Sequence, residues 1–470
     1  MSGLFSTLAN SVKALDAHSR AIEIAGRNIS NVNNPNYARQ RVIYGDRGTV
    51  VTPQGAMSLG LEALSVEQLR DRILDGQVLR ETALRAGYEA EQRGYQQAQA
   101  SLGQTVSSAN STDSVDATTT GGIAASLDDF FNSFQSLAAR PTDTGERQLL
   151  LQKASILTDR LRLTDTRLAQ VQSSLDDQVA SDVSKVNQLL QSIAQLNGQI
   201  GSAEVNNPGS AVDLRDERQA RLEDLAALMP VDVSEGSNGE IQVSSRDASN
   251  NPVVLVSAAT VTGPVTVSGT TISAGSPATA LNLASGSIAG AITARTGAVQ
   301  DLRDNLDKLT QQLVTSVNNA YNPTGTTGNF FDPAGVTAGT IAIAAGVTAT
   351  TLKASDGGAA GDNTIALAVA NLAQQSFSTA GGDAIDGTFS QHFASTVSNL
   401  GQALASANSR AADESNIEQL VRSQRDSVSG VSLDEEMSDL VRFQRAYQAS
   451  SRVFSIVNDL LDTVVNHLGA

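Results

Sequence analysis

Residues 427–468 decide the fold, and they read SVSGVSLDEEMSDLVRFQRAYQASSRVFSIVNDLLDTVVNHL. From Leu440 onward, apolar residues recur at alternating intervals of three and four, and only Ser450 interrupts them. This spacing is typical of a coiled-coil seam, because it keeps one face of a helix in line with a partner helix. The sequence therefore predicts a long terminal helix that needs a second helix to cover it. The seam comprises Leu440, Phe443, Tyr447, Ser450, Phe454, Val457, Leu461, Val464 and Leu468.

The opposite terminus carries a second stripe with the same spacing, which predicts an amphipathic helix from Met1 to about Ser30. In one interpretation, the terminal helices pack only on each other and close a globular domain. In the other, they pair and also pack against copies of themselves in neighbouring subunits, which builds an assembly. The assembly interface expected in the second interpretation is made of Leu4, Leu8, Leu15, Ile22, Ile29, Leu440, Phe443, Tyr447, Phe454, Val457, Leu461, Val464 and Leu468.

Apolar stripes with helical spacing also fill most of the chain between the termini. The run 146–200 alone predicts a rod on the order of 80 Å long. Together the stripes predict a mainly α, elongated, multidomain protein, with a long helical-bundle rod, terminal coiled-coil helices and a small inserted β domain. The expected inner helices span residues 61–109, 127–137, 146–200, 214–229, 299–321 and 388–427.

The composition changes at Val231, where short β-branched runs begin, separated by Gly, Asn and Ser. Such runs predict an all-β segment, and its position between helical stretches predicts an insertion that protrudes from the rod. A further strand is expected at residues 340–343. The predicted domains are a terminal coiled coil (1–45 with 425–470), a discontinuous helical rod (46–230 with 285–424) and the inserted β domain (231–284).

An asparagine-rich stretch follows the first helix, and residues 28–40 read NISNVNNPNYARQ. Asn tolerates left-handed backbone, and Pro pushes the residue before it out of the helical region. The helix is therefore expected to stop near Ser30, and the chain then continues in an extended conformation. Taken alone, the pattern is that of an ordinary helix-stop loop. The residues that mark this turn are Asn31, Pro35, Tyr37, Arg39 and Gln40.

Composition argues against several classes of function. The 470 residues include no cysteine and only three scattered histidines, which disfavours disulfides, cysteine nucleophiles and clustered metal ligands. The formal charge of −17 disfavours nucleic acid and anionic membranes as partners. No stretch approaches the roughly 20 apolar residues of a membrane span, and no cleavable signal peptide is recognisable. From these features alone, the chain is expected to be a soluble cytoplasmic protein.

No catalytic motif stands out. The sequence lacks a phosphate-binding loop, a His-Glu-x-x-His zinc motif and a Gly-x-Ser-x-Gly nucleophile elbow. Adjacent carboxylates such as Glu435 and Glu436 diverge by about 100° on a helix, so they are expected to be solvated charges at a helix start. Residues 356–363 faintly resemble a calcium loop, but the spacing of the ligands is wrong. We therefore expect no catalytic residue, no cofactor and no metal.

Three stretches match one family pattern. They are residues 26–40, GRNISNVNNPNYARQ; the helical residues 129–148 together with 214–218, LRDER; and residues 429–437, SGVSLDEEM, followed by Leu440, Phe443, Gln444 and Tyr447. In these stretches the chain resembles the flagellar hook-associated protein 1 family, the hook–filament junction proteins of bacteria. The third stretch is the most specific. Arg27 and Asn36 stand where the family often has Asn and Gly. Asn is the best substitute for Gly at a left-handed turn position, so the turn is expected to survive.

The resemblance implies a non-enzymatic structural subunit of the extracellular flagellum, exported unfolded and without a cleaved signal. It implies a ring between hook and filament, with paired terminal helices lining the inner tube. The implied partners are further copies of the chain, the hook protein, and the second junction protein with the filament. The apolar C-terminal helix is a candidate site for an export chaperone. The alternatives are a flagellin, the second junction protein, or a secreted adhesin or enzyme that binds through its β segment.

Overall fold

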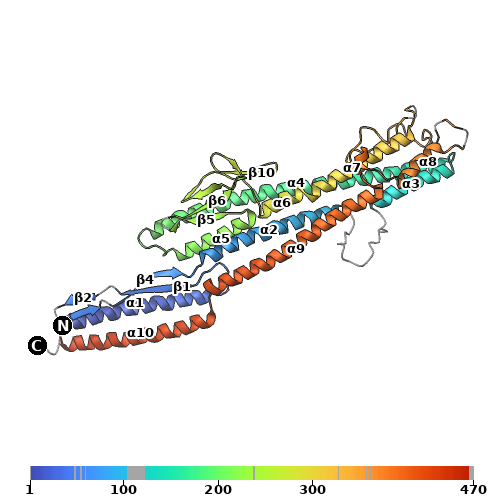
Figure 1. Ribbon diagram of the computed structural model, residues 1–470. Helices are drawn as coiled ribbons and strands as arrows, with labels where there is room; N and C mark the ends of the chain where they lie inside the picture. The colour runs from blue at the N-terminus through green and yellow to red at the C-terminus, as the bar shows by residue number, and fades with distance from the viewer. Residues whose placement is uncertain are drawn as a thin grey trace. The chain divides into compact units, whose positions relative to one another are not determined.

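Helices make up most of the chain (Figure 1). Long helices are interrupted by small antiparallel sheets, which confirms the expected mainly α fold with a small β insertion. The computed structural model describes residues 2–46, 49–52, 55–58, 60–102, 122–236, 239–325, 328–355, 357–358 and 361–464.

The chain divides into two compact units, and each is described by itself. The three-domain division expected from the sequence stays a prediction. Helices α2 (Arg72–Ser101), α4 (Thr144–Glu204) and α9 (Phe389–Ser429) contribute residues to both units. The first unit comprises Met1–Arg85, Val183–Gly286 and Glu414–Ala470, and the second comprises Ala86–Asp182 and Ser287–Asp413.

The terminal helices pair within the first unit. Helices α1 (Ser2–Ser30) and α10 (Leu433–Asp462) pack against each other and run antiparallel, so the start of α1 lies beside the end of α10 (Figure 1). Small residues dominate the most buried face of α1, where Ala17, Ala21 and Ala25 are 0–2% exposed. Both predicted terminal helices are therefore present, and each is the partner of the other in the single chain.

An antiparallel ribbon lies along α1 and leads into α2. The expected helix start at residue 61 is wrong, because residues 61–68 form a strand. Asp71 explains why α2 begins later: its carboxylate accepts hydrogen bonds from the backbone N–H groups of Ile73 and Leu74, which caps the helix. The paired strands are β1 (Gln40–Asp46) with β4 (Leu61–Gln68), and β2 (Thr49–Thr52) with β3 (Gly55–Ser58).

The β insertion follows α5 (Val212–Leu228) and builds a core of its own, where Val243, Leu255 and Val256 are fully buried. The chain leaves the helices at Leu228 and returns at Gly286, whose Cα lies so close to the Leu228 carbonyl that a Cβ there would be 2.5 Å from its oxygen. The segment is therefore a true insertion whose two ends meet. Its strands are β5 (Asp232–Glu235), β6 (Ile241–Arg246), β7 (Pro252–Ser257) and β8 (Thr260–Val261) in one sheet, and β9 (Thr266–Ser268), β10 (Thr271–Ala274) and β11 (Thr279–Ala280) in another.

Phenylalanines form the core at one end of the second unit. Phe130 contacts four other rings at centroid distances of 5.2–5.7 Å, and the expected placement of the 127–137 cluster in a core is correct. The strand expected at residues 340–343 is reduced to one isolated bridge between Phe331 and Ile343. The remaining elements are α3 (Ile123–Ala139), α6 (Ser287–Thr296), α7 (Ala298–Tyr321), α8 (Thr364–Asn371) and the short 3-10 helices Leu372–Gln374 and Thr379–Gly381.

Candidate functional site

The asparagine-rich turn closes the C-terminal end of α1, as the sequence predicts. The backbone N–H of Asn31 bonds the carbonyls of Arg27 and Asn28, which finishes the helix. Asn34 then organises the turn, because its side-chain oxygen accepts from the N–H of Asn36 and its carbonyl accepts from that of Tyr37. The turn leads directly into β1 at Gln40.

Asn28 is the centre of this region, and it is 1% exposed. Its Oδ1 accepts from the N–H of Gln40 at 3.0 Å and from the Tyr37 hydroxyl at 2.7 Å. Its Nδ2 donates to the Gln40 carbonyl at 2.9 Å and to Glu436 Oε2 at 3.0 Å. Burial, reinforced by the charges of Asp216 and Asp213, raises the pKa of Tyr37, so its hydroxyl keeps the proton that it donates.

Arg39 connects the turn to the start of α10. Its Nε donates to Glu436 Oε1 at 2.6 Å, and its Nη1 donates to Glu435 Oε2 at 2.7 Å. Its backbone N–H bonds the carbonyl of Ser429, the last residue of α9. The N-terminal turn and the C-terminal Leu-Asp-Glu-Glu stretch, nearly 400 residues apart in sequence, are therefore one polar cluster.

The structure corrects one expectation about these carboxylates. Glu435 is exposed in the first turn of α10, as expected, but Glu436 is only 3% exposed and is bound by Asn28 and Arg39. Sequence reasoning missed Asn28 and Glu436 as partners. The available signal was a polar residue on the buried stripe of each helix, four positions before Leu440 in the case of Glu436.

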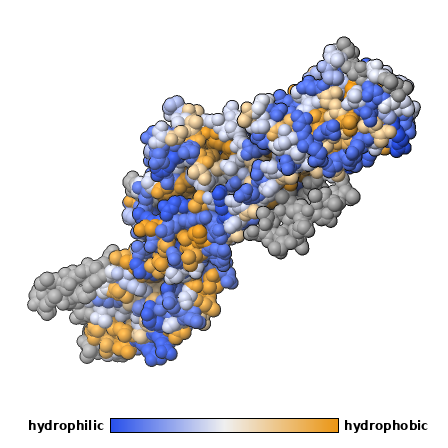
Figure 2. Space-filling view, turned by 45° about the vertical axis from the view of Figure 1, so that its right-hand side comes forward, coloured by the Kyte–Doolittle hydropathy of each residue, from blue (hydrophilic) through white to orange (hydrophobic). Residues whose placement is uncertain are grey.

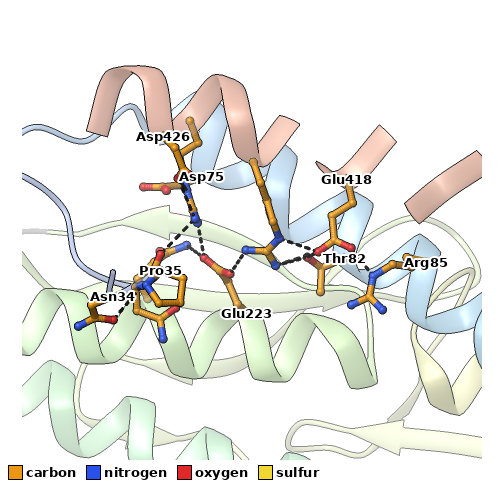
Figure 3. A network of polar contacts seen from close by, with 12 residues as sticks. Asn34, Pro35, Asp75, Thr82, Arg85, Glu223, Glu418 and Asp426 are labelled. Atoms are coloured by element: carbon orange, nitrogen blue, oxygen red, sulfur yellow. Dashed lines mark hydrogen bonds and ion pairs between the residues drawn. The ribbon is translucent and has the colours of Figure 1, made fainter. Parts of the chain in front are cut away.

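A second network of charges adjoins the turn (Figure 3). Glu223 of α5 accepts from Arg422 and from Arg425 of α9, each at 2.7 Å. Arg422 continues to Glu418, and Glu418 also binds Arg85 and Thr82 of α2. The network thus joins α2, α5 and α9 through alternating charges.

The predicted interface residues divide by exposure in the single chain. Val457 and Leu461 of α10, which packs against α1, are buried, while Tyr447 is 40% exposed. Leu468 lies outside the described residues. The half-buried members are Leu4, Leu8, Leu15, Ile22, Ile29, Leu440, Phe443, Phe454 and Val464.

Helix α10 also carries large apolar side chains outside the seam, which the sequence analysis did not mark. They are 42–60% exposed. With about 100° of rotation per residue, they form two groups on different faces of the helix. The first group, near the start of α10, is Leu433, Met437 and Val441; the second, near its end, is Val453, Ile456 and Leu460, which we call the outer stripe. Figure 2 shows apolar patches on the part of the first unit that α1 and α10 form.

The described residues of this region form packing surfaces and ion pairs. No three His, Cys, Asp or Glu side chains among them are grouped so that they could hold a metal ion. In the same part of the chain, every helix is too short or too polar to cross a membrane.

Comparisons with known proteins agree with this architecture. The description "Flagellar hook-associated protein FlgK helical domain" matches residues 109–331, and "Flagellar basal body rod FlgEFG protein C-terminal" matches residues 422–467. The flagellar hook-associated protein 1 of Bacillus subtilis is 26% identical over 524 aligned positions, which cover 100% of this chain and 99% of that protein. The Escherichia coli protein of the same name is 25% identical over 51% of this chain and 41% of its own length.

A solved structure of the flagellar hook junction protein FlgK from Burkholderia pseudomallei is also similar, with 22% identity and a TM-score of 0.44. The similarity covers 52% of this chain and 43% of that one. The two family descriptions fall on the helical middle and on the C-terminal helix, and the relative from Bacillus subtilis spans the whole chain. Residues 109–331 thus match the FlgK helical domain, and over its whole length this chain is similar to flagellar hook-associated protein 1.

Proposed function

We propose that this chain is a structural subunit of the bacterial flagellum, which forms the junction between hook and filament. The family supports this role, and so does an architecture of long helices and ion pairs. The observation that carries the proposal is the number of large apolar side chains that α10 leaves exposed, since monomeric proteins rarely expose large apolar patches. A subunit of this kind acts by packing, not by catalysis.

The terminal helices form the assembly interface in this proposal, and the two faces of α10 have separate tasks. The seam around Val457 and Leu461 holds α10 against α1 within the chain. The outer stripe, Val453, Ile456 and Leu460, is free to bury its side chains against the same helix pair of neighbouring copies. A head-to-tail contact of this kind between identical subunits closes into a ring when the rotation allows.

The further partners follow from a place between hook and filament. We expect the hook protein on one side of the ring, and the second junction protein with the filament on the other. The protein then works outside the cell and reaches its place through flagellar export without a cleaved signal. During export, the exposed stripe of α10 needs cover, and a chaperone bound at this helix would provide it.

The test places a charge on the outer stripe without disturbing the pair. Ile456→Asp is expected to leave the helical circular dichroism of the monomer unchanged, because Ile456 is 60% exposed. It is expected to abolish filament attachment and motility, because a carboxylate cannot be buried unpaired at an apolar contact. Ser455→Asp is the matched control: it adds the same charge at an exposed neighbouring position and should be tolerated. Normal filaments on cells with Ile456→Asp would contradict the proposal.

Substitutions on the seam are less specific tests. Leu461 is 7% exposed in the single chain, so Leu461→Asp should loosen α1 from α10 as well as block assembly. A comparison of Leu461→Asp with Ile456→Asp therefore separates folding of the pair from contact between subunits.

A further inference from the structure

Helix α4 exposes a row of large apolar side chains in the second unit. Leu149, Ile156 and Leu163 are 42%, 36% and 49% exposed, and each follows the last after seven residues. At about 100° of rotation per residue, this spacing keeps all three on one side of the helix, as in the seam of a coiled coil. Arg167 continues the row one turn later; it is exposed and forms no ion pair in the described part of the chain.

The last part of α9 exposes a second apolar row. Ile417, Leu420 and Val428 are 44%, 60% and 49% exposed, and their spacing keeps them within about 80° of one another around the helix. Asp413 lies on the same side, one turn before Ile417, and is exposed. Its Oδ2 accepts a hydrogen bond from Ser409 Oγ of the same helix at 3.5 Å, and among the described residues it forms no ion pair.

The two rows complement each other in length and in charge. Leu149 to Arg167 span about 27 Å along α4, and Asp413 to Val428 span about 22 Å along α9. Residues 147–167 include five basic and two acidic side chains, whereas residues 413–428 include four acidic and two basic ones. The α4 row therefore lies on a positive stretch of a chain whose formal charge is −17, and the α9 row lies on a negative stretch. Opposite charges around matched apolar rows favour one partner and one register.

We propose that the α4 row of one copy of this chain packs against the α9 row of a neighbouring copy. The inference rests on the proposed function, and it adds a contact between subunits that lies outside the terminal helices. The charges set the direction, because Arg167 ends its row and Asp413 begins the other. With these two side chains paired, the helices run antiparallel, Leu163 lies opposite Ile417, and the Leu149 end of one row meets the end of the other.

Such a contact joins two different surfaces of identical subunits. It is therefore heterologous and repeats from copy to copy, as closure into a ring requires. Burial of the apolar side chains on both rows supplies the affinity, while the charged pair at the end of the rows sets the register.

The test is disulfide cross-linking in purified flagella, for which the chain is suited because it contains no cysteine. Two versions of the full-length chain with different affinity tags are expressed in the same cells, one with Leu163→Cys and the other with Ile417→Cys. A product that carries both tags joins two different molecules by construction. Both positions are exposed in the single chain, so folding should not be disturbed. A disulfide forms only when the two Cα atoms come within about 7 Å.

We expect the mixed product from the pair 163/417 after oxidation of the flagella. Leu149→Cys is the matched control, since it lies on the same row but about 21 Å from Leu163 along α4, and with Ile417→Cys it should give no product. Equal yields from the two pairs would overturn the antiparallel contact. So would a product that joins two Leu163→Cys chains in place of the mixed one, because it would show a two-fold contact of α4 with itself.

The same experiment separates this contact from the proposed function. Flagella that contain both tagged chains without the 163/417 product would overturn the contact alone. Absence of both chains from purified flagella would overturn the proposed function, and the contact with it.

Charge reversal tests the register independently. In the 163/417 pair, Arg167→Glu or Asp413→Arg alone should lower the yield of the mixed product several-fold, because each places like charges opposite each other. Arg167→Glu on the chain with Leu163→Cys, combined with Asp413→Arg on the chain with Ile417→Cys, should restore it. Arg162→Glu is the control on α4, since Arg162 is exposed on another side of the helix. A double reversal that restores nothing would overturn the pairing of Arg167 with Asp413.

Discussion

Asparagine side chains dock four extended segments of this protein onto its helices. A helix asparagine accepts a hydrogen bond from the backbone N–H of one extended residue, and donates one to the carbonyl of that same residue. The carboxamide carries both an acceptor and donors, so it pairs with a backbone as another strand would. The pairs among the described residues are Asn28 with Gln40, Asn187 with Val265, Asn197 with Ile241, and Asn318 with Phe331.

Asn28→Leu tests this device at the polar cluster. The substitution keeps the side-chain size but removes the Asn28 bonds to both backbone groups of Gln40 and to Glu436 Oε2. We expect a loss of about 2–5 kcal/mol in the free energy of unfolding, measured by urea denaturation. Asn33→Leu, at an exposed position of the same stretch, should change stability by less than about 0.5 kcal/mol. Equal effects of the two substitutions would contradict the role of Asn28.

Asp216 gives stability a specific dependence on pH. Burial raises the pKa of its carboxyl from 3.8 to about 6, against the opposing attraction of Arg70. The folded chain therefore holds a proton on Asp216 more tightly than the unfolded chain does. The contribution of Asp216 to stability is greatest below 3.8 and falls as the pH rises through about 6. Glu204 and Glu418 act in the opposite sense: hydrogen bonds lower the pKa of each despite burial, so their contribution is lost in acid.

Asp216→Asn should remove the first of these dependences. The difference in free energy of unfolding between this variant and the parent is expected to change by on the order of 2–3 kcal/mol between about pH 4 and about pH 7, in favour of the variant at the higher pH. Thermal or urea unfolding across this range is the measurement. Asp224→Asn, on an exposed side chain of the same helix, should give no such change. Parallel pH profiles of Asp216→Asn and the parent would refute the assignment.

At the scale of elements, a close helix crossing depends on glycine. In the second unit, Gly290 of α6 faces Gly87 of α2 so closely that a Cβ on Gly290 would lie 2.0 Å from the Gly87 carbonyl oxygen. The two helices therefore meet backbone to backbone, and any side chain at Gly290 would force them apart.

Gly290→Ala is expected to cost about 1–3 kcal/mol of stability, because the crossing is overpacked. Gly76→Ala is the matched control on α2, where no heavy atom lies within 4 Å of the added Cβ. That substitution should stabilise the protein by about 0.5–1 kcal/mol through the better helix propensity of Ala. Calorimetry of both variants checks whether the two substitutions change stability in opposite directions. A stabilising effect of Gly290→Ala would show that the crossing is not tight.

Helix α10 shows why one apolar stripe is not enough to define a surface. Its seam, from Leu440 to Leu461, has the spacing of a coiled coil and packs against α1. Its outer stripe, Val453, Ile456 and Leu460, is 46–60% exposed in the single chain. A helix that is apolar on more than one face needs a partner on each.

At the scale of the whole molecule, the path of the chain makes the β insertion separable from the helices. Its ends meet at Leu228 and Gly286, and its own core is buried. We expect that replacing residues 232–284 by a short Gly-Ser linker leaves the helices folded, with cooperative thermal unfolding followed by circular dichroism at a helical wavelength. Loss of cooperative unfolding would show that the insertion is part of the helical core.

The sequence by itself determined the features that depend on local spacing. The three-four repeat of apolar residues predicted α1, α4, α7 and α10, because one face of each helix must be buried wherever it lies. Asn and Pro in residues 31–36 predicted the end of α1, since backbone preference there is a property of the residues themselves. The change to β-branched runs at Val231 predicted the insertion for the same reason.

Only the tertiary structure decided which polar residues meet. The spacing from Leu440 places Glu436 on the buried stripe of α10, but nothing local shows that it meets Asn28 and Arg39 there. Residues 61–68 became a strand because β1 offers hydrogen bonds to them, and pairing between distant segments leaves no mark in either segment alone. Arg70 and Arg425 likewise form their ion pairs only because the fold brings carboxylates of α5, Asp216 and Glu223, opposite them.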